Sequence, residues 1–476
     1  MLALAALSLG RAFAAEIVEP WDDGTTPRRR YEVDEAGRRI GRYVEYHRDG
    51  KAVATSANYR DGALDGPYLE SYENGRPRLR AAYRAGRREG RLEALEPDGA
   101  PLEVAAYVGG RLDGKRQVWR AKRLVATQSW KAGALVTLDG AIAFPRVRDD
   151  VERTVARILS GELPAIPPAS RTRPAAGGQG GGAGSPSGPP SPALAAAPAG
   201  LAALRDEALR RLRAYRYVCE VPWEDLVAGE AESLSAQYAS LVCAKLGTIA
   251  HEPSNPGLPE ALFRICARAA SECNQTSGVG MTGRAAVDAF MDDSDAANVG
   301  RLGHRRSLLA LELQTTGFGF SDGEAQRFVA MSKYGAGRAR SPDLPFVVFP
   351  GRGWTPTDMC SSHHAWSVGI EPVTALQLDV AGATIRVRRL SDDFVPADEE
   401  LPIERFPFDK DSRKGGRPAL IFRPVGVEVV EGAAYLAELS AVDPKTHRPT
   451  VFLRWVAGFC AARAGSPASA MPDVRR

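Results

Sequence analysis

A repeating pattern of apolar strands and polar turns runs through residues 27–140. One set of glycines recurs at steps of 25, 24 and 24 residues: Gly41, Gly66, Gly90 and Gly114. A second set follows the first three by nine residues: Gly50, Gly75 and Gly99. Each of these ends a short turn, as in Arg48-Asp49-Gly50, and Asp-Gly or Asn-Gly pairs supply the positive φ angles of a tight hairpin. Tyr59, Tyr83 and Tyr107 recur at steps of 24 residues. The pattern therefore predicts a row of β-hairpins, each covering the aromatic residues of its neighbour.

The next stretch changes from periodic to low-complexity sequence. Val151, Val155, Ile158 and Leu159 recur at helical spacing, which predicts a helix over residues 148–160. Residues 164–200 are rich in Pro, Gly, Ala and Ser. Such a composition cannot bury a core, so we expect a flexible tether. Its glycines lack the Gly-Lys-Ser/Thr of a phosphate-binding loop.

The C-terminal part of the chain contains a region with helical periodicity followed by a region of short strand-like runs. Residues 201–335 begin with helical patterns, such as the one through Leu204, Leu209 and Leu212, and end in a hairpin over Thr315 to Tyr334. Residues 345–460 contain short apolar runs such as AWSVGI and TVFLRWVAGF, separated by Gly, Pro and Asp turns. Several short strands at this spacing predict a β-sandwich.

Composition narrows the functional classes. The 476 residues suggest about three domains at roughly 150 residues each. The formal net charge of +4 is small for this length and does not favour a nucleic-acid-binding protein. No run of 18 apolar residues occurs, so we expect no transmembrane segment.

Two features predict export. Leu2 to Leu9 is a short apolar run, and Ala12-Phe13-Ala14 is a small-x-small cleavage pattern, although the usual positive residues before the run are missing. The alternative is an apolar N-terminal strand. Six cysteines suit disulfides in an oxidising compartment, and the alternative is six buried free thiols. They are Cys219, Cys243, Cys266, Cys273, Cys360 and Cys460.

Candidate chemistry concentrates between Arg284 and Phe320. A helical apolar pattern at Val287, Phe290 and Met291 precedes an acidic loop. Asp292, Asp293 and Asp295 lie in that loop, and Gly303-His304-Arg305-Arg306 follows. Carboxylates and an imidazole between apolar segments are the groups that a metal or ligand site requires.

With these residues placed, the middle of the chain resembles the CAP superfamily (cysteine-rich secretory, antigen 5 and pathogenesis-related proteins), also called the SCP domain. The matching features are a His251 after the second helix, residues 286–291 (AVDAFM), Gly303-His304-Arg305 and residues 316–320 (TGFGF). The pieces at 213–219, 291–295 and 364–368 resemble a bacterial subfamily in which a β-rich domain follows the CAP domain. The N-terminal repeat resembles MORN-type repeats over about four units.

The resemblance implies a fold and a metal site. CAP domains are α-β-α sandwiches whose cleft, in many members, holds two His and two acidic residues that bind zinc or another divalent ion. His251 and His304 match the two histidines. Glu272 matches one acid in a Ser-Glu-Cys-Asn sequence, and Asp292, Asp293 or Asp295 supplies the other. The alternative is that both histidines are hydrogen-bonded cleft residues without a metal.

MORN-type repeats are linked to lipid binding and scaffolding, which gives the repeat arginines a functional interpretation. A basic face for anionic lipid or glycan is one expectation, and a solvated surface that keeps the sheet soluble is the other. These arginines are Arg28, Arg29, Arg30, Arg78, Arg80, Arg84, Arg87 and Arg88.

Three other motifs carry weaker predictions. Counting Asp293 as position one of a calcium loop places Asn298 where glycine is needed, so a solvated acidic loop is favoured. Ser321 lies in a G-x-S-x-G sequence, but a strand rather than a helix is expected after it, so we interpret Ser321 as a hairpin-turn residue. His363 and His364 are neighbours; in a strand they would point to opposite faces and would not share a metal.

The sequence thus predicts a multidomain α+β protein. Its expected parts are a signal peptide (1–14), β-hairpin repeats (15–145), a short helix and linker (146–200), a CAP domain with an α-β-α sandwich (201–340), a β-sandwich-like domain (341–463) and a disordered tail (464–476). We expect a secreted, periplasmic or cell-surface protein that holds a ligand, lipid, glycan or envelope partner, with zinc or another divalent cation in the cleft. The alternatives are a metal-dependent hydrolase that uses His251, His304 and an acid, and an architectural spacer. No catalytic residue is assigned.

Overall fold

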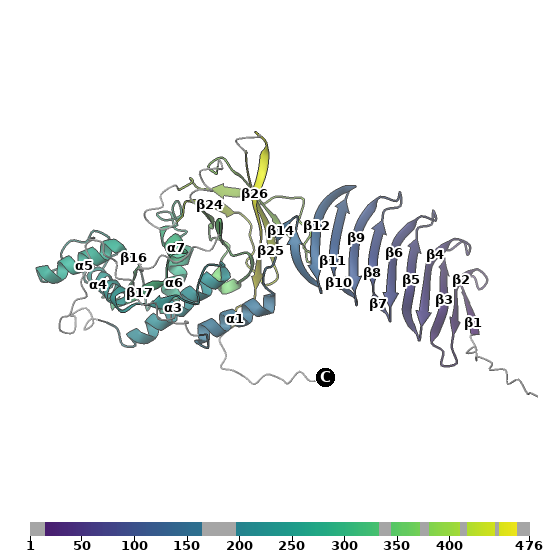
Figure 1. Cartoon of the computed structure of the whole chain (residues 1–476), viewed down its shortest axis with the longest axis horizontal. Coiled ribbons are helices and arrows are strands. Elements are labelled where there is room, and N and C mark those ends of the chain that lie inside the picture. Colours follow the sequence, from purple (N-terminus) through teal and green to yellow (C-terminus); the bar gives the residue numbers. More distant parts are fainter. Residues whose placement is uncertain are drawn as a thin grey trace, which may run out of the picture. The chain divides into compact units, whose positions relative to one another are not determined.

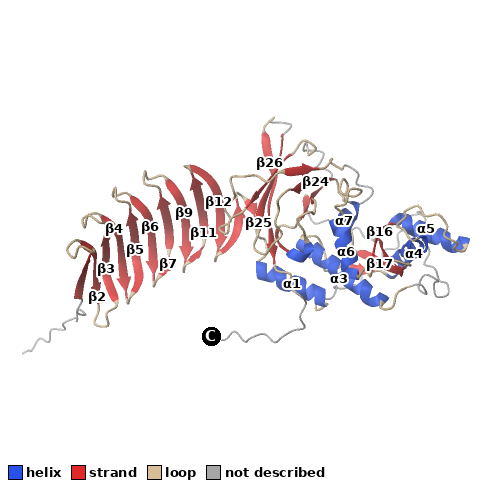
Figure 2. Ribbon diagram, turned by 180° about the vertical axis from the view of Figure 1, so that it is seen from behind, coloured by secondary structure: helices blue, strands red, loops and turns tan. Residues whose placement is uncertain are grey.

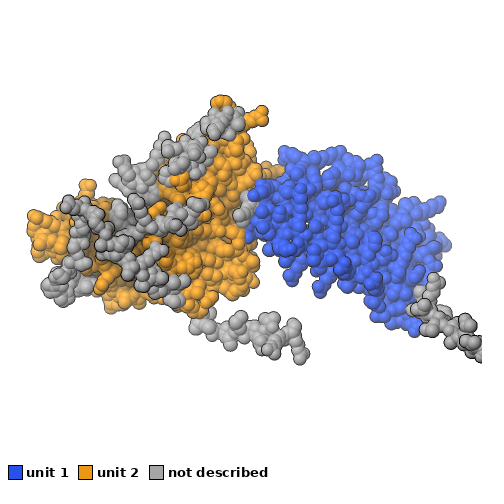
Figure 3. Space-filling view, in the orientation of Figure 1, with its two compact units in different colours: residues 1–144, 391–396 blue, residues 145–390, 397–476 orange. Residues whose placement is uncertain are grey.

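The structure, a computed structural model, describes residues 15–163, 197–332, 344–371, 380–409, 417–442 and 447–463. It divides into two compact units (Figure 3). Unit 1 comprises the chain up to Phe144 together with Ser391–Pro396, and unit 2 comprises the rest. The expected signal peptide, most of the linker and the expected tail lie outside the described residues.

Unit 1 is one antiparallel sheet of fourteen strands, which follow one another side by side in chain order (Figure 1). Its strands are β1 (Ala15–Pro20), β2 (Pro27–Val33), β3 (Arg39–Tyr46), β4 (Val53–Arg60), β5 (Ala63–Ser71), β6 (Pro77–Arg84), β7 (Arg87–Arg88), β8 (Gly90–Leu95), β9 (Pro101–Val108), β10 (Arg111–Leu112), β11 (Gly114–Arg120), β12 (Arg123–Lys131), β13 (Ala134–Leu138) and β14 (Ala141–Ile142). The short β7 and β10 pair only with β6 and β9.

Glycine and tyrosine explain why this repeat forms hairpins. Gly50, Gly75 and Gly99 lie in connections between strands with φ of 63°, 77° and 92°, a backbone region that favours glycine. Tyr31 and Tyr43 pack with ring centroids 6.0 Å apart, and the Arg39 guanidinium lies 4.9 Å from the Tyr31 centroid. Neighbouring hairpins therefore bury one another's aromatic rings, with stacked cations adding to the contact.

Residues Ser391–Pro396 cover part of the same sheet. The Gln128 side-chain amide donates to the carbonyls of Asp393 and Phe394 at 2.9 and 2.8 Å. The Phe394 ring packs 5.1 Å from Phe144 and 6.0 Å from Trp130. A segment distant in sequence thus belongs to the hydrophobic core of unit 1.

Unit 2 contains the α-helices of the described residues (Figure 2). They are α1 (Arg148–Ser160), α3 (Leu201–Val218), α4 (Glu230–Leu246), α5 (Glu260–Glu272), α6 (Gly283–Asp292) and α7 (Gly303–Leu308). The helix predicted over residues 148–160 is confirmed. Among these helices, none combines the length and the apolar character that a membrane crossing requires.

Three four-stranded sheets complete unit 2. The first has the order β15-β17-β18-β16, the second β19-β21-β24-β23 and the third β20-β26-β25-β22. Their strands are β15 (Val227–Ala228), β16 (Cys273–Gly278), β17 (Thr315–Asp322), β18 (Arg327–Ser332), β19 (Phe346–Phe349), β20 (Gly353–Pro356), β21 (Trp366–Ile370), β22 (Thr384–Arg389), β23 (Ile403–Arg405), β24 (Ala419–Pro424), β25 (Ala434–Val442) and β26 (Pro449–Cys460). Trp366 and Trp455 pack with ring centroids 6.1 Å apart, which joins the second and third sheets through an aromatic core.

Two glycines decide how α4 packs on β17. A Cβ on Gly317 would lie 2.1 Å from the Ser233 nitrogen, and one on Gly319 would lie 2.2 Å from the Ala236 carbonyl carbon. Because i and i+2 residues share one face of a strand, both glycines open the same face to the helix backbone. The Gly-x-Gly sequence therefore permits direct contact between helix and sheet.

The predicted fold class is wrong. The chain is mostly β, with 26 strands and six α-helices among the described residues, and it does not contain the expected α-β-α sandwich. The helical residues 201–308 accompany a sheet of only four short strands, and two further sheets belong to the same compact unit. Helical periodicity identified helices but could not indicate how small a sheet they accompany.

The cysteines also differ from the favoured expectation. All six lie in the described part of the chain, all are buried, and none forms a disulfide. Burial raises the pKa of the Cys219 and Cys360 thiols to about 12. They are therefore buried thiols, the alternative that the sequence left open.

Candidate metal centre

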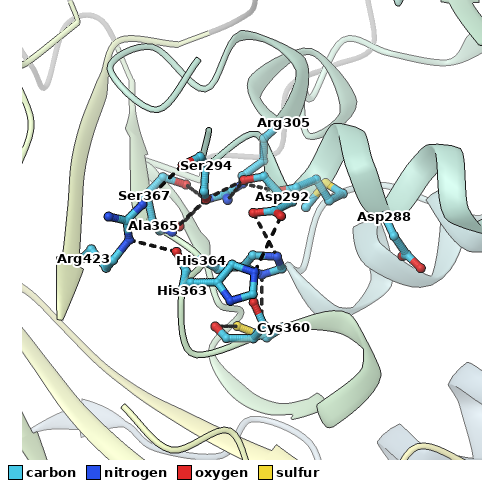
Figure 4. A network of polar contacts seen from close by, with 12 residues as sticks. Asp288, Asp292, Ser294, Arg305, Cys360, His363, His364, Ala365, Ser367 and Arg423 are labelled. Atoms are coloured by element: carbon cyan, nitrogen blue, oxygen red, sulfur yellow. Dashed lines mark hydrogen bonds and ion pairs between the residues drawn. The ribbon is translucent and has the colours of Figure 1, made fainter. Parts of the chain in front are cut away.

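Two segments 71 residues apart in sequence form the site. Asp292 is the last residue of α6, where the helix ends because Asp293 adopts a left-handed conformation with φ of 48°. His363 and His364 lie in and after a turn that precedes β21. The two segments approach each other, and Figure 4 shows the Asp292 carboxylate directed toward both imidazoles.

The three side chains form a group that could hold a metal ion. His364 Nε2 lies 3.1 Å from Asp292 Oδ1, and His363 Nε2 lies 3.9 Å from Asp292 Oδ2. One ligand atom from each residue lies within 4.8 Å of the others, and no other group of three or more His, Cys, Asp or Glu residues in the described chain meets this condition. The donor set is two imidazole nitrogens and one carboxylate.

The Asp292 carboxylate is ionised and incompletely satisfied. Burial alone raises its pKa, but the neighbouring His364 and His363 outweigh burial and hold the pKa at about 2. Oδ1 is buried and makes no hydrogen bond among the described residues, although His364 Nε2 lies 3.1 Å away as an ion-pair partner. A buried anionic oxygen without a hydrogen bond is costly unless a cation completes its environment.

His364 is oriented by the backbone of its own turn. The Ser361 N–H donates to His364 Nδ1 at 3.2 Å, which directs Nε2 toward Asp292. The ring is buried and packs 5.9 Å from the Phe349 ring. Burial lowers the His364 pKa more than Asp292 raises it, so the imidazole is neutral at pH 7, as metal ligation requires.

His363 differs from His364 in its freedom to move. Its side chain is 72% exposed, so its imidazole can reorient at little cost. Its backbone is fixed, because Arg423 Nε donates to the His363 carbonyl at 2.8 Å.

A pocket of about 290 Å³ opens beside the triad. Asp288 and Asp358 line its wall together with Tyr215 and Cys360. The Arg211 guanidinium donates to Asp288 at 2.7 Å and to Asp358 at 2.9 Å, and Tyr215 donates to Asp288 at 2.8 Å. Both carboxylates are therefore engaged by fixed partners, whereas Asp292 faces the histidines.

The metal ligands predicted from the sequence do not lie together in the structure. Asp293 Oδ1 pairs with His304 Nδ1 at 2.9 Å, while its Oδ2 accepts from the His304 backbone N–H at 3.0 Å. This pair joins the end of α6 to the start of α7. Asp295 accepts hydrogen bonds from Ala297 and Asn298 within its own loop, as expected for the acidic-loop alternative.

The other predicted ligands are also held elsewhere. His251 Nδ1 lies 3.0 Å from the Ala270 carbonyl. Glu272 pairs with Arg268 one turn earlier on α5. Of the predicted residues, only Asp292 belongs to the three-residue group, and His251, His304 and Glu272 are not part of it.

Two predicted positions differ in the structure. His363 and His364 are not strand residues: His363 lies in a turn before β21 and His364 directly follows it, and both imidazoles lie near Asp292. The Cys-Ser-Ser-His-His sequence, rich in turn-forming serine, was the available signal. Ser321 lies within β17 rather than in a turn, and its buried hydroxyl is 2.9 Å from that of Ser240.

Comparison with known proteins adds no assignment. No protein-family model matches the chain, and a search of curated proteins gives no match either.

Proposed function

We propose that this chain binds a divalent transition-metal ion of the zinc class through Asp292, His363 and His364. The observation that carries the proposal is the buried Asp292 oxygen, which makes no hydrogen bond in the described chain and faces two imidazoles. Two nitrogens and one oxygen are ligands that zinc accepts, and copper and nickel accept the same set.

The separation between ligand atoms supports this assignment. Zinc lies about 2.0–2.2 Å from nitrogen and oxygen ligands, so two such ligands at roughly tetrahedral angles are about 3.4 Å apart. The 3.1 Å between His364 Nε2 and Asp292 Oδ1 is close to this spacing. His363 needs only a side-chain rotation, which its exposure permits.

Binding at His364 Nε2 has one identifiable cost. The Ser361 N–H donates to Nδ1, so the neutral ring carries its proton on Nε2. A metal at Nε2 requires the proton to move to Nδ1, at the expense of the Ser361 hydrogen bond. Two N–H groups then face each other, and such an unsatisfied donor costs about 1–3 kcal/mol, which is small beside the free energy of metal binding.

The test is zinc binding by the full chain without an affinity tag. After treatment with a chelator, we expect calorimetric titration to show one zinc ion per chain. Asp292→Asn and His364→Ala should each weaken binding at least about tenfold, because a ligand is lost. His251→Ala is a matched control outside the triad, since His251 is held by the Ala270 carbonyl, and it should bind zinc as the wild type does. The proposal fails if the wild type takes up no zinc, or if this control loses as much affinity as the triad variants.

A metal-dependent hydrolase is the second candidate. Three protein ligands beside an open pocket are the arrangement in which zinc keeps a position for water. The residues that could act as a base, Asp288 and Asp358, are already held by Arg211, which weakens this candidate. Equal hydrolysis of ester, amide and phosphoester substrates by zinc-loaded and metal-free protein would exclude it and leave a binding or architectural role.

Export remains part of the proposal, on the sequence pattern of residues 2–14 alone. Expression of the full chain in a bacterium with a periplasm tests it. A periplasmic product beginning at Ala15 supports export, and an uncleaved cytoplasmic chain contradicts it.

A further inference from the structure

One arginine, Arg305, connects the segment that carries Asp292 to the segment that carries His363 and His364. Arg305, on α7, donates from Nε to the Met291 carbonyl at 2.6 Å and from Nη2 to the Asp292 carbonyl at 2.6 Å. Its Nη1 donates to the Ala365 carbonyl at 2.5 Å. One planar guanidinium thus holds the end of α6 and the residue that follows His364 (Figure 4).

The environment of Arg305 is unusual for a charged group. Its side chain is fully buried and lies 4.3 Å from the Phe349 ring centroid. Among the described residues no carboxylate pairs with it, and its close partners are backbone carbonyls, the Ser367 hydroxyl at 3.4 Å and the ring. Burying an unpaired charge is costly, and such a group persists where its geometry is needed.

Further hydrogen bonds also join the end of α6 to the turn that carries the histidines. Ser294 Oγ donates to the Asp292 carbonyl at 2.7 Å and accepts from the Ala365 N–H at 3.0 Å. Arg423 donates to the carbonyls of His363 and Ser294 at 2.8 and 3.3 Å. The α6 end and the histidine turn are therefore joined by hydrogen bonds to their backbones, while their side chains face each other.

We propose that Arg305 is the positioning residue of the metal centre: its fork fixes the separation between Asp292 and the two histidines. This inference rests on the proposed metal-binding function. Arg305 does not touch the metal position; it orients the ligands, and outer partners of this kind typically change metal affinity about 10- to 100-fold when they are removed.

Arg213 offers a matched control. It is also buried, on α3, and it also donates to backbone carbonyls, those of Trp223 at 3.1 Å and Leu163 at 2.8 Å. Neither carbonyl belongs to a segment that carries a triad residue or Arg305. Lysine keeps the charge at either position but loses the planar fork. Arg305→Lys and Arg213→Lys therefore remove the same kind of contact in different places.

The experiment measures zinc affinity and thermal unfolding of the full chain for both variants. We expect both to lower the unfolding temperature, but only Arg305→Lys to weaken zinc binding, by about 10- to 100-fold. Its cobalt-substituted form should also show an altered ligand-field spectrum, because the ligand geometry changes. Arg305→Met, in which an apolar side chain fills the same space, should show the same loss of affinity, and it replaces Arg305→Lys if the lysine variant does not fold.

The outcomes separate this inference from the function on which it rests. A wild-type chain that binds no zinc contradicts the metal-binding proposal itself. A wild type that binds zinc, with Arg305→Lys or Arg305→Met as tight as Arg213→Lys, leaves that function standing and overturns the positioning role.

Discussion

At the scale of single residues, Glu152 shows how a buried charge joins distant segments of unit 2. Its side chain is 3% exposed on α1, where Oε1 accepts from Arg148 at 2.9 Å. Its other oxygen pairs with Arg463 at 2.7 Å, and the Ala461 N–H donates to Oε1 at 3.3 Å. The carboxylate thus holds the start of α1 against the chain that follows β26.

This arrangement predicts a pH-dependent contribution to stability. Burial alone raises the Glu152 pKa, but Arg148 and Arg463 outweigh it, so the folded-state pKa lies below the ordinary value. A lowered pKa stabilises the fold above the unfolded pKa of about 4.3, and this contribution is lost as the pH falls through the folded value. Glu152→Gln should lower the free energy of unfolding by about 1–3 kcal/mol at pH 7, and the difference from wild type should shrink below pH 4. Urea unfolding at several pH values measures it, and a difference independent of pH contradicts it.

Only part of the candidate metal site could be predicted from the sequence. The acidic loop after α6 could be recognised because helical spacing ended there, and it contains Asp292. The alternating faces of a strand do not apply to His363 and His364, because His363 lies in a turn and His364 directly follows it. The pairing of Asp293 with His304 depends on how α6 and α7 pack, and no spacing in the sequence specifies that contact.

At the scale of elements, glycine positions decide which surfaces touch. The contact of α4 with β17 requires that Gly317 and Gly319 have no side chains. Gly317→Ala should therefore destabilise unit 2 by about 1–3 kcal/mol through overpacking against helix backbone, which cannot move aside. Gly300→Ala is the control, since a Cβ there meets nothing within 4 Å and its φ is not positive. Chemical denaturation of both variants measures the difference, and equal stabilities would contradict the packing argument.

Elements were predictable where local periodicity is strong. The turns at Gly50, Gly75 and Gly99 require positive φ, and the sequence marks each with Asp-Gly or Asn-Gly. The helix over residues 148–160 followed from a single apolar face. The order of strands in the sheets of unit 2 was not predictable, because β20 pairs in parallel with β26 across about a hundred residues, and such pairing has no local signal.

At the scale of the whole molecule, the units do not follow chain order. Residues 391–396 belong to unit 1 although both flanking stretches belong to unit 2. The predicted boundary at residue 145 lies next to the end of the first stretch of unit 1, whereas the predicted division near residue 340 lies inside unit 2. Contacts between distant segments define the units, and composition contains no information on such contacts.

The cysteines provide a test of the whole fold. All six are buried and none forms a disulfide, so the folded chain should react slowly with iodoacetamide, and the chain unfolded without reductant should take up six labels. Mass spectrometry counts the labels, and fewer than six after unfolding without reductant would indicate disulfides. The unfolding temperature should likewise be unchanged by a thiol reductant, because no cross-link restrains the unfolded chain. If the chain is exported as proposed, its stability outside the cytoplasm then depends on burial of these thiols rather than on their oxidation.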